Sequence, residues 1–439
     1  MSESTGSASA PAAPRAGQHA LTRWLAQAPP WVFSAYAVAM AFTTYFCMYS
    51  FRKPYTAAGY EGPSFGALEF QIALVLSQTI GYAISKFSGI KINSEMPRHR
   101  RAWALLLFIV WAELALVLFA VLPGRAKILA LFLNGLPLGM VWGLVFSFLE
   151  GRRTSEILGA GLSCSYIVAS GYVKSAGKWL IVDQGVNPFW MPALTGLLFL
   201  PLFLLAVYGL SLLPNPSAED IAARVDRAPM TRHERWAFTR RYWFGLLLLV
   251  ITYFFLTAFR SVRDDFEGII WAELGFSEEP AVFASTANYI AFAVMLALAL
   301  LYLIRSNRLG LLATFAIMLI GSALVGVSTL LFDIGAIGPM AWMILVGLGL
   351  YLAYVPYGCV LFDRMIAALG VVATSVFLIY VSDAIGYSGS VGVLLYKNFG
   401  QSDISMLEFL RGFSYVMSVV TSILFVLSAV YFMRRAEHD

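Results

Sequence analysis

The chain has 439 residues, of which 59% are hydrophobic and only 13% are charged, and its mean hydropathy is +0.75. Soluble domains are about 45–50% apolar and about 25% charged, and hydrophobic cores stop growing beyond roughly 250–300 residues, so this composition excludes a cytosolic enzyme. The net charge of +5 does not indicate a nucleic-acid partner, because membrane proteins collect Lys and Arg in their cytoplasmic loops. The sequence predicts a protein whose solvent is lipid.

The residues that usually hold metals or carry out covalent catalysis lie in unsuitable places. The three cysteines, Cys47, Cys164 and Cys359, fall within apolar stretches and lack a CxxC spacing. The four histidines, His19, His99, His233 and His438, lie outside the apolar stretches. No GxxxxGK[ST] motif occurs in the chain, and no apolar span holds a GxSxG or HExxH motif. We therefore expect no metal, no cofactor, no bound nucleotide and no enzymatic activity.

The chain begins with a polar segment and continues with apolar ones. Residues 1–20 are rich in Ser, Ala, Pro and Gly, which predicts a disordered tail, and residues 21–28 predict an interfacial helix, which together give an N-terminal segment over 1–30. Twelve segments long enough for a helix of about 20 residues across the membrane follow: 31–53, 68–90, 102–122, 127–149, 157–180, 188–213, 242–263, 280–303, 309–331, 337–361, 368–396 and 408–432. The predicted fold is an all-α polytopic membrane protein with twelve transmembrane helices in two six-helix halves.

The connections between the spans predict the orientation and the domain boundaries. Lys and Arg are concentrated on the side of the N-terminus, whereas the opposite connections hold only Arg125, Lys127, Lys397 and Arg411; this predicts cytoplasmic termini. The longest connection, 214–241, opens with the helix N-cap pattern Ser217-Ala-Glu-Asp. It separates a first half over 31–213 from a second half over 242–432, and residues 433–439 form a cytoplasmic tail.

An internal repeat supports the two halves. The segment Thr44-Tyr-Phe-Cys-Met-Tyr-Ser-Phe-Arg52 of the first span matches Thr252-Tyr-Phe-Phe-Leu-Thr-Ala-Phe-Arg260 of the seventh in Thr, Tyr, Phe, Phe and Arg. A weaker similarity links Gly135-Leu-Pro-Leu with Gly347-Leu-Gly-Leu, each followed by an arginine, Arg152 and Arg364. Because each copy of the stronger repeat ends in an arginine, we expect Arg52 and Arg260 at equivalent positions, facing each other across the centre of the protein.

These motifs resemble the major facilitator superfamily and, within it, the organophosphate:phosphate antiporter family. The resemblance rests on Arg52-Lys53, on Arg260 with Asp265, and on a loop with Ser85-Lys86-Phe87, Gly89, Ser94-Glu95 and the basic residues Arg98, Arg100 and Arg101. The chain departs from the family in Glu95, where aspartate is usual, and in the absence of a histidine from the fifth span. The resemblance implies the major facilitator fold, a monomer, a bacterial inner (plasma) membrane, and a gating role for the loop with Lys86, Glu95 and Arg101. Plain positive-inside charge is the alternative reading of that loop.

The arginine pair has two readings. An arginine at membrane depth costs about 2.5–3.5 kcal/mol on insertion scales, and guanidinium groups bind phosphate or carboxylate oxygens bidentately, which favours an anion site. Snorkelling to the headgroups is the alternative. Helical spacing places hydroxyl groups on the same faces as the arginines, from Tyr45, Tyr49, Tyr253 and Thr257. The superfamily's architecture implies further cavity residues on spans four and ten: Asn134, Trp142, Tyr351 and Tyr354.

Other charges within or near the spans are open to more than one interpretation. Lys53, Asp264 and Asp265 either pair with the arginines in the empty protein or belong to an outer loop. Lys174 and Asp383 line a wet cavity or lock the two halves together by charge pairing, and Asp383 would serve a proton-coupled carrier. Glu113 has apolar neighbours and is either protonated or a structural partner. Four glycines, Gly81, Gly89, Gly135 and Gly139, are expected to allow close helix packing.

The leading functional hypothesis is a secondary transporter of a small organic anion. A phosphate ester exchanged for inorganic phosphate is the substrate that the resemblance implies, with alternating access around one site between the two repeats. A proton- or sodium-coupled symporter of a carboxylate or sugar acid is the alternative in the same class. A sensor with a transporter fold that binds its ligand without moving it is the alternative in another class. The expected partners are the small anion and the lipid bilayer.

Overall fold

The computed structural model describes residues 19–149, 155–215, 232–371 and 375–438. The first bundle in these residues contains six long helices: α2 (Pro30–Met48), α3 (Phe70–Glu95), α4 (Arg98–Val121), α5 (Ala126–Leu149), α6 (Ser155–Val182) and α7 (Met191–Ser211). The second bundle contains α9 (Arg232–Asp265), α11 (Ala281–Tyr302), α12 (Asn307–Asp333), α13 (Pro339–Tyr354), α16 (Ser375–Gly400) and α17 (Met406–His438). Shorter helical segments complete the chain: α1 (Ala20–Gln27), η1 (Tyr49–Phe51), η2 (Pro54–Ala57), α10 (Glu267–Glu273), α14 (Pro356–Cys359) and α15 (Leu361–Leu369).

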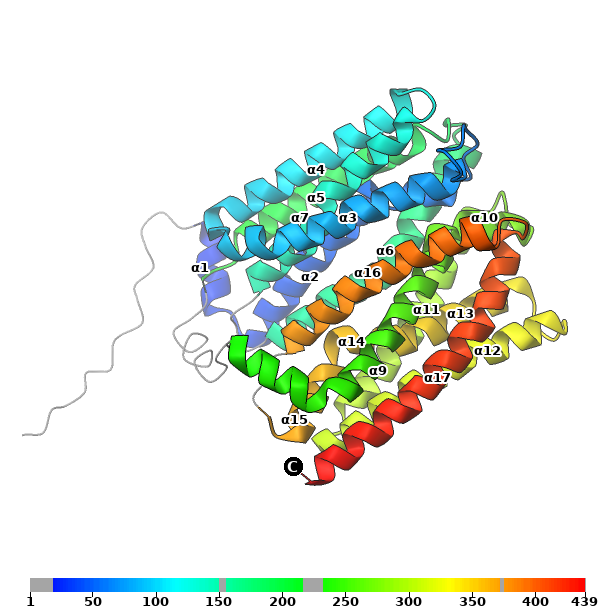
Figure 1. The fold of residues 1–439 in the computed structure, drawn as a ribbon. Helices are drawn as coiled ribbons and strands as arrows, with labels where there is room; N and C mark the ends of the chain where they lie inside the picture. The colour runs from blue at the N-terminus through cyan, green and yellow to red at the C-terminus, as the bar shows by residue number, and fades with distance from the viewer. Residues whose placement is uncertain (1–18, 150–154, 216–231, 372–374, 439) are drawn as a thin grey trace, which may run out of the picture.

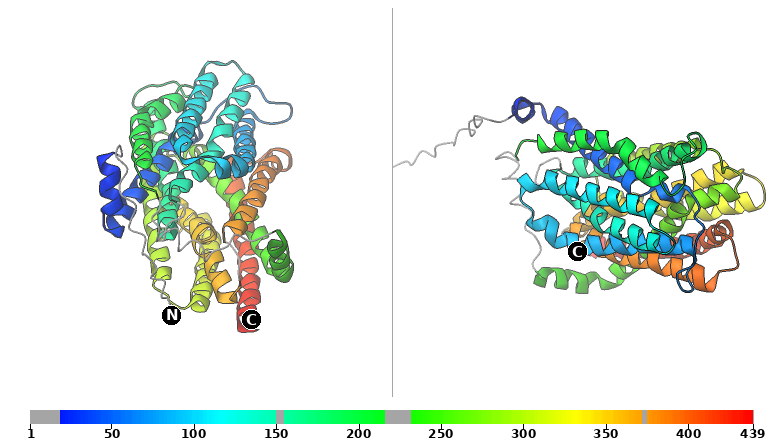
Figure 2. Two further views of the ribbon diagram at one scale, coloured as in Figure 1. Left: turned by 90° about the vertical axis from the view of Figure 1, so that its left-hand side faces the viewer. Right: turned by 90° about the horizontal axis from the view of Figure 1, so that it is seen from above.

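The two bundles form two layers. The first, blue to teal, lies above the second, green to red, in Figure 1, and the end-on view in Figure 2 keeps the same separation. Contacts between the layers run mainly through two helix pairs, α6 with α11 and α3 with α16, and through η2 with α10. Any site at the centre of the protein is therefore bounded by elements from both layers.

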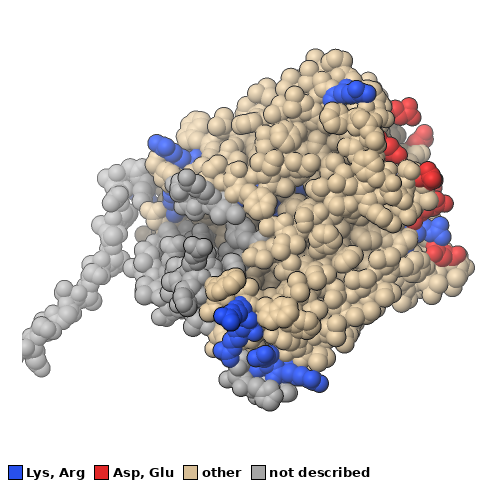
Figure 3. Space-filling model, in the orientation of Figure 1, with Lys and Arg blue, Asp and Glu red and all other residues tan. Residues whose placement is uncertain are grey.

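The long helices have the length and composition of membrane spans. Nine helices of the described chain are long and apolar enough to cross a bilayer, and the others among the twelve, α3, α6 and α16, are long helices that carry more polar residues, including Lys86, Lys174 and Asp383. Figure 3 shows an uncharged belt between an end rich in Lys and Arg, where the C-terminus lies, and an end rich in Asp and Glu. The chain is an all-α polytopic membrane protein.

The first and tenth predicted spans match the observed ones to within two residues but are irregular inside. The first span is α-helical only to Met48 and continues as η1 and η2, because Pro54 lacks the N–H that an α-helix would need there. The tenth span breaks at Pro356 for the same reason. Helix α9 begins at Arg232, inside the segment predicted as a linker, and kinks at Tyr242; the N-cap predicted at Ser217 lies outside the described residues.

Helices α3 and α5 approach each other closely within the first bundle. A Cβ atom added at Gly81 would collide with the backbone oxygen of Phe132, and one added at Gly135 would collide with the backbone of Gln78 and Tyr82. Gly139 lies against Tyr82 and Ser85 in the same way. These contacts agree with the predicted packing role of the three glycines, and they fix the position of the α3 side chains that face the centre of the protein.

Candidate functional site

Arg52 lies in an irregular segment that two buried amides hold in place. The Gln78 Nε2 group donates to the Arg52 carbonyl at 3.0 Å and to the Asn134 Oδ1 atom at 2.8 Å. The Asn134 Nδ2 group donates to the carbonyls of Phe51 at 2.9 Å and Ala112 at 3.0 Å. Because the chain leaves the α-helix at Met48, the carbonyls of Phe51 and Arg52 need other donors. The two amides supply them and thereby fix the direction in which Arg52 points.

The arginine pair lines one cavity, which we call the arginine cavity. Its walls come from both bundles: Tyr49, Arg52, Lys53, Thr79, Arg260, Ser261, Asp264, Asp265 and Tyr387. The guanidinium carbon of Arg52 lies 3.7 Å from the centre of the Tyr82 ring, and that of Arg260 lies 4.8 Å from the centre of the Tyr354 ring. The aromatic faces hold the guanidinium groups by cation–π attraction and leave their N–H groups available to other acceptors.

Neither arginine of the pair forms a salt bridge with a carboxylate of the described chain. The Nε atom of Arg52 is buried and has no hydrogen-bond partner among the described residues. Buried polar groups are paired in the great majority of native structures, and an exception calls for an explanation such as a missing ligand. The arginine cavity therefore contains donors that are suited to an anion.

A buried ion-pair cluster, which we call the charge lock, joins the halves beside this cavity. It consists of Lys53, Lys174, Asp264, Asp265 and Glu267. The Lys53 ammonium contacts both aspartates, and the Lys174 ammonium lies 2.7 Å from Asp264 Oδ1 and 2.7 Å from Glu267 Oε2. The lysines belong to the first half and the carboxylates to the second. The lock therefore holds α10 and the end of α9 against α6 and η2.

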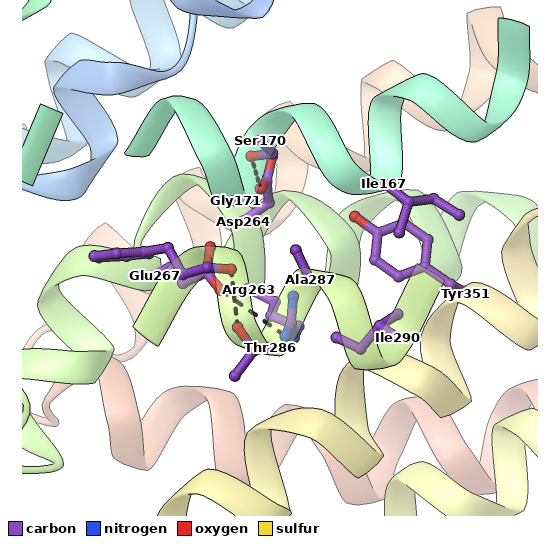
Figure 4. Close-up of a pocket in the computed structure, with 11 residues that line it drawn as sticks. Ile167, Ser170, Gly171, Arg263, Asp264, Glu267, Thr286, Ala287, Ile290 and Tyr351 are labelled. Carbon is purple, nitrogen blue, oxygen red and sulfur yellow. Dashed lines mark hydrogen bonds and ion pairs between the residues drawn. The ribbon is translucent and has the colours of Figure 1, made fainter. Parts of the chain in front are cut away.

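A second cavity lies against the charge lock (Figure 4), and its walls include Ser170, Arg263, Asp264, Glu267 and Tyr351. The Ser170 hydroxyl donates to Asp264 Oδ1 at 2.6 Å, and Arg263 Nη2 lies 3.9 Å from Glu267 Oε1 and donates to the Met343 carbonyl at 3.0 Å. The polar groups of this second cavity are thus largely engaged with one another.

The charges around the arginine cavity do not balance. The cations of the cavity and the adjoining charge lock are Arg52, Lys53, Lys174, Arg260 and Arg263, whereas the carboxylates there are Asp264, Asp265 and Glu267. The three lock carboxylates face Lys53, Lys174 and Arg263. The two positive charges in excess are therefore those of Arg52 and Arg260.

A further ion pair crosses between the halves on α3 and α16. Lys86 Nζ lies 2.7 Å from Asp383 Oδ2, and the Tyr253 hydroxyl donates to Asp383 Oδ1 at 2.7 Å and to the Tyr354 hydroxyl at 2.9 Å. Both charged side chains are roughly a quarter exposed. Tyr354 therefore links this ion pair to Arg260, which lies over its ring.

Several predicted contacts are corrected by the geometry. Asp264 and Asp265 pair with lysines and not with the arginine pair. Of the two alternatives for Lys174 and Asp383, charge pairing between the halves agrees with the geometry, because both lie in ion pairs with residues of the other half. The Thr257 hydroxyl donates to the Tyr253 carbonyl of its own helix, and Thr257 is not among the residues that line the arginine cavity.

Other predicted site residues also lie outside the arginine cavity. The Asn134 side chain donates to two backbone carbonyls and accepts a hydrogen bond from Gln78. Trp142 stacks on Phe146, and Tyr45 packs edge-on against Tyr49. Tyr351 lines the second cavity. In the predicted gating loop, Arg101 donates to the Ser147 carbonyl at 2.6 Å, and the side chain of Glu95 lies outside the described residues.

The sequence did not single out several residues that the structure places at the site. They are Tyr82, Tyr387, Gln78, Thr79, Ser261, Arg263 and Glu267. Tyr82 lies four residues before Lys86 and Tyr387 four residues after Asp383, on the same helix faces as those charges. This helical spacing from an intramembrane charge is the sequence pattern from which the two tyrosines could have been predicted at the site. Among the described residues, no group of three or more His, Cys, Asp or Glu side chains could hold a metal ion.

Comparison with known proteins places the fold in a known class. Two solved structures with this architecture are a glutamate-to-glutamine mutant of the peptide transporter POT in complex with sulfate and the same mutant in complex with alafosfalin. The first is 14% identical, with a TM-score of 0.56, and the match covers 94% of this chain and 99% of that chain. The second is 13% identical, with a TM-score of 0.60, and the match covers 96% and 99%. No curated protein matches the chain.

The class is therefore an all-α polytopic membrane protein with the major facilitator fold. Within that class, the chain belongs to the family of unknown function DUF5690, whose model matches residues 54–435. The fold expected from the sequence is confirmed. The narrower resemblance to the organophosphate:phosphate antiporters is not supported by these comparisons and stays a prediction.

Proposed function

We propose that the protein is a secondary transporter that binds a small anion between Arg52 and Arg260. The observation that carries this proposal is that two arginines, one from each half, line a single cavity without a carboxylate partner in the described chain. A guanidinium group keeps its charge at any physiological pH and matches oxyanions bidentately. An anion bound there neutralises the two charges in excess.

The position of the cavity supports alternating access. In carriers built from two repeats, the substrate site lies between the repeats, and the halves rock around it. Here the charge lock closes the interface on one side of the arginine pair, and the Lys86–Asp383 ion pair joins α3 and α16 as well. An anion that contacts both arginines favours conformations in which the halves close around it. Breaking either the charge lock or the Lys86–Asp383 ion pair then opens a path from the cavity to one side of the membrane.

For the substrate we propose a phosphate ester, exchanged for inorganic phosphate. A doubly charged phosphate has enough acceptor oxygens for two guanidinium groups, and Tyr49, Thr79 and Tyr387 provide hydroxyl groups in the same cavity. The charge distribution of Figure 3 supports a membrane orientation with the basic end and both termini in the cytoplasm. We further propose that this is the inner membrane of a bacterium.

The test is counterflow in liposomes that contain the purified protein. Liposomes loaded with unlabelled phosphate and diluted into labelled phosphate are expected to accumulate label transiently at clamped pH without an ion gradient. A panel of phosphate esters, phosphonates, carboxylates and sulfate on the inside then ranks substrates by how well each drives uptake. Sulfate belongs in the panel because one of the similar structures is in complex with it.

Two outcomes of this experiment contradict the proposal in different ways. Uptake that requires a proton or sodium gradient contradicts exchange and favours symport. The second outcome is that no anion of the panel is taken up, although the anions raise the melting temperature of the protein. This result contradicts transport and favours a sensor that binds the anion.

A further inference from the structure

Helix α4 carries a carboxyl group that the proposed function does not use. Glu113 is the only acidic residue of α4. Both of its side-chain oxygens are buried, and neither has a hydrogen-bond partner among the described residues. The carboxylates of Asp264, Asp265, Glu267 and Asp383 all lie in ion pairs, which makes Glu113 an exception that needs a physical explanation.

The carboxyl group is packed between α7 and η1. A Cβ atom added at Gly196 of α7 would collide with Glu113 Oε2 and with the ring of Phe51, so the absence of a side chain at Gly196 makes room for both groups. Helix α7 has no Asp, Glu, Lys, Arg or His along Met191–Ser211. The junction of α4, α7 and η1 therefore offers Glu113 an apolar surrounding.

Charged and polar groups on the neighbouring elements are engaged elsewhere, including the hydroxyls of Ser50 and Thr195, which donate to backbone carbonyls. On α5, Lys127 donates to the carbonyls of Phe119 and Ala120, and Asn134 donates to the carbonyls of Phe51 and Ala112. After η1, the Arg52 guanidinium lies over the Tyr82 ring. On α4 itself, the basic residues 98–101 are at least about 18 Å away along the helix axis.

We propose that Glu113 is a proton-binding site that holds its proton in this conformation, sealed from water by Phe51. An ionised carboxylate in an apolar site without a counter-ion costs so much free energy that the group takes up a proton instead. Phe51 immediately precedes Arg52, a wall of the arginine cavity. Any movement of η1 that lets water reach the carboxyl group therefore also moves Arg52, and the release of the proton is linked to the shape of the anion site.

The test uses dicyclohexylcarbodiimide, a carbodiimide that partitions into membranes and reacts with protonated carboxyl groups. The acid adds across one C=N bond: its oxygen bonds to the central carbon, its proton passes to a nitrogen, and an O-to-N shift gives a stable N-acylurea without a leaving group. Peptide mapping by mass spectrometry of the full chain in liposomes at about pH 8, well above the usual Glu value of about 4.3, is expected to find the adduct on Glu113. Asp333, which is paired with Arg411, is the internal control and is expected to stay unmodified.

The variant Phe51→Ala tests the seal. It is expected to lower labelling of Glu113 at about pH 8 by at least about tenfold, because the protonated fraction falls tenfold for each pH unit above the midpoint. Labelling at about pH 4 is expected to match the parent, which shows that the reagent has access, and circular dichroism checks that the variant is folded. Absence of the adduct from Glu113 in the parent overturns the proton site, and equal labelling of both proteins at about pH 8 overturns the seal. Neither outcome depends on an anion being transported.

Discussion

The ammonium group of Lys174 lies 2.7 Å from the carboxylate of Glu267, and no part of the Lys174 side chain is exposed. The two residues belong to different halves, and 93 positions separate them in the chain. Lys174 also contacts Asp264, which is shared with Lys53. The charge lock therefore gathers four ion pairs between the halves at one place, directly beside the arginine cavity.

Breaking the lock at Lys174 is expected to destabilise the protein strongly. Lys174→Met leaves Asp264 and Glu267 buried with one partner fewer, and removing one member of a buried ion pair costs about 3–5 kcal/mol. The control Arg411→Met breaks the more exposed pair with Asp333, where about 0–1 kcal/mol is expected. Thermal unfolding in detergent measures both, and equal losses of stability would contradict the buried character of the lock.

Lys86 and Asp383 are expected to depend on each other. Lys86→Glu or Asp383→Lys alone places like charges side by side at the interface of α3 and α16, where Lys86 and Asp383 are paired, whereas the double exchange restores an opposite pair. We expect each single variant to raise hydrogen exchange along both helices and the double variant to bring it back toward the parent. If the increase in hydrogen exchange of the double variant equals the sum of the increases of the two single variants, the ion pair contributes nothing to the contact between the halves.

Asn134 is expected to act through Arg52 and not through the ligand. Asn134→Leu leaves the buried carbonyl of Phe51 without its side-chain donor, and an unsatisfied buried group costs about 1–3 kcal/mol. The matched control is Asn288→Leu, since Asn288 is exposed and bonds only the Tyr172 hydroxyl among the described residues. The melting temperature is expected to fall markedly for Asn134→Leu alone; a folded, stable variant with altered anion preference would instead make Asn134 a ligand residue.

Two helical glycines offer a matched test of the α3–α5 crossing. A Cβ atom at Gly135 collides with backbone atoms of Gln78 and Tyr82, whereas one at Gly412 meets nothing within 4 Å. Gly135→Ala is therefore expected to lower folded yield and melting temperature. Gly412→Ala is expected to be neutral or to stabilise by up to about 1 kcal/mol through helix propensity. Equal behaviour of the two variants in a thermal scan would argue against close approach at Gly135.

The sequence predicted those parts of the fold that depend on local composition. Long apolar segments have few alternatives to a helix in lipid, so the positions of the long helices follow from hydropathy. The repeat predicted that Arg52 and Arg260 belong together, and both line the arginine cavity. The break after Met48 and the extension of α9 back to Arg232 depend on hydrogen bonds and packing that hydropathy does not contain.

The partners within the site could not be predicted, because they depend on contacts between distant residues. Lys86 and Asp383 are 297 positions apart, and neither local sequence contains a pattern that predicts their pairing. Tyr82 and Tyr387 are two tyrosines among 21, so their side-chain type carries no signal by itself. Asp264 was expected beside the arginine pair or in a loop, whereas the presence of Lys174 on α6 decides its pairing.

The measurement that tests the central claim most directly is the affinity for inorganic phosphate of Arg52→Lys and Arg260→Lys. Lysine keeps the charge and loses the bidentate geometry, so each substitution is expected to weaken binding at least about tenfold, which corresponds to about 1.4 kcal/mol. Arg411→Lys, on the outer surface of α17, serves as the control, and circular dichroism checks the fold of all variants. Loss of affinity in both variants, with the control unchanged, is the result that the account predicts. If either variant binds phosphate as tightly as the parent, that arginine does not bind the anion, and the account of a two-arginine site is contradicted.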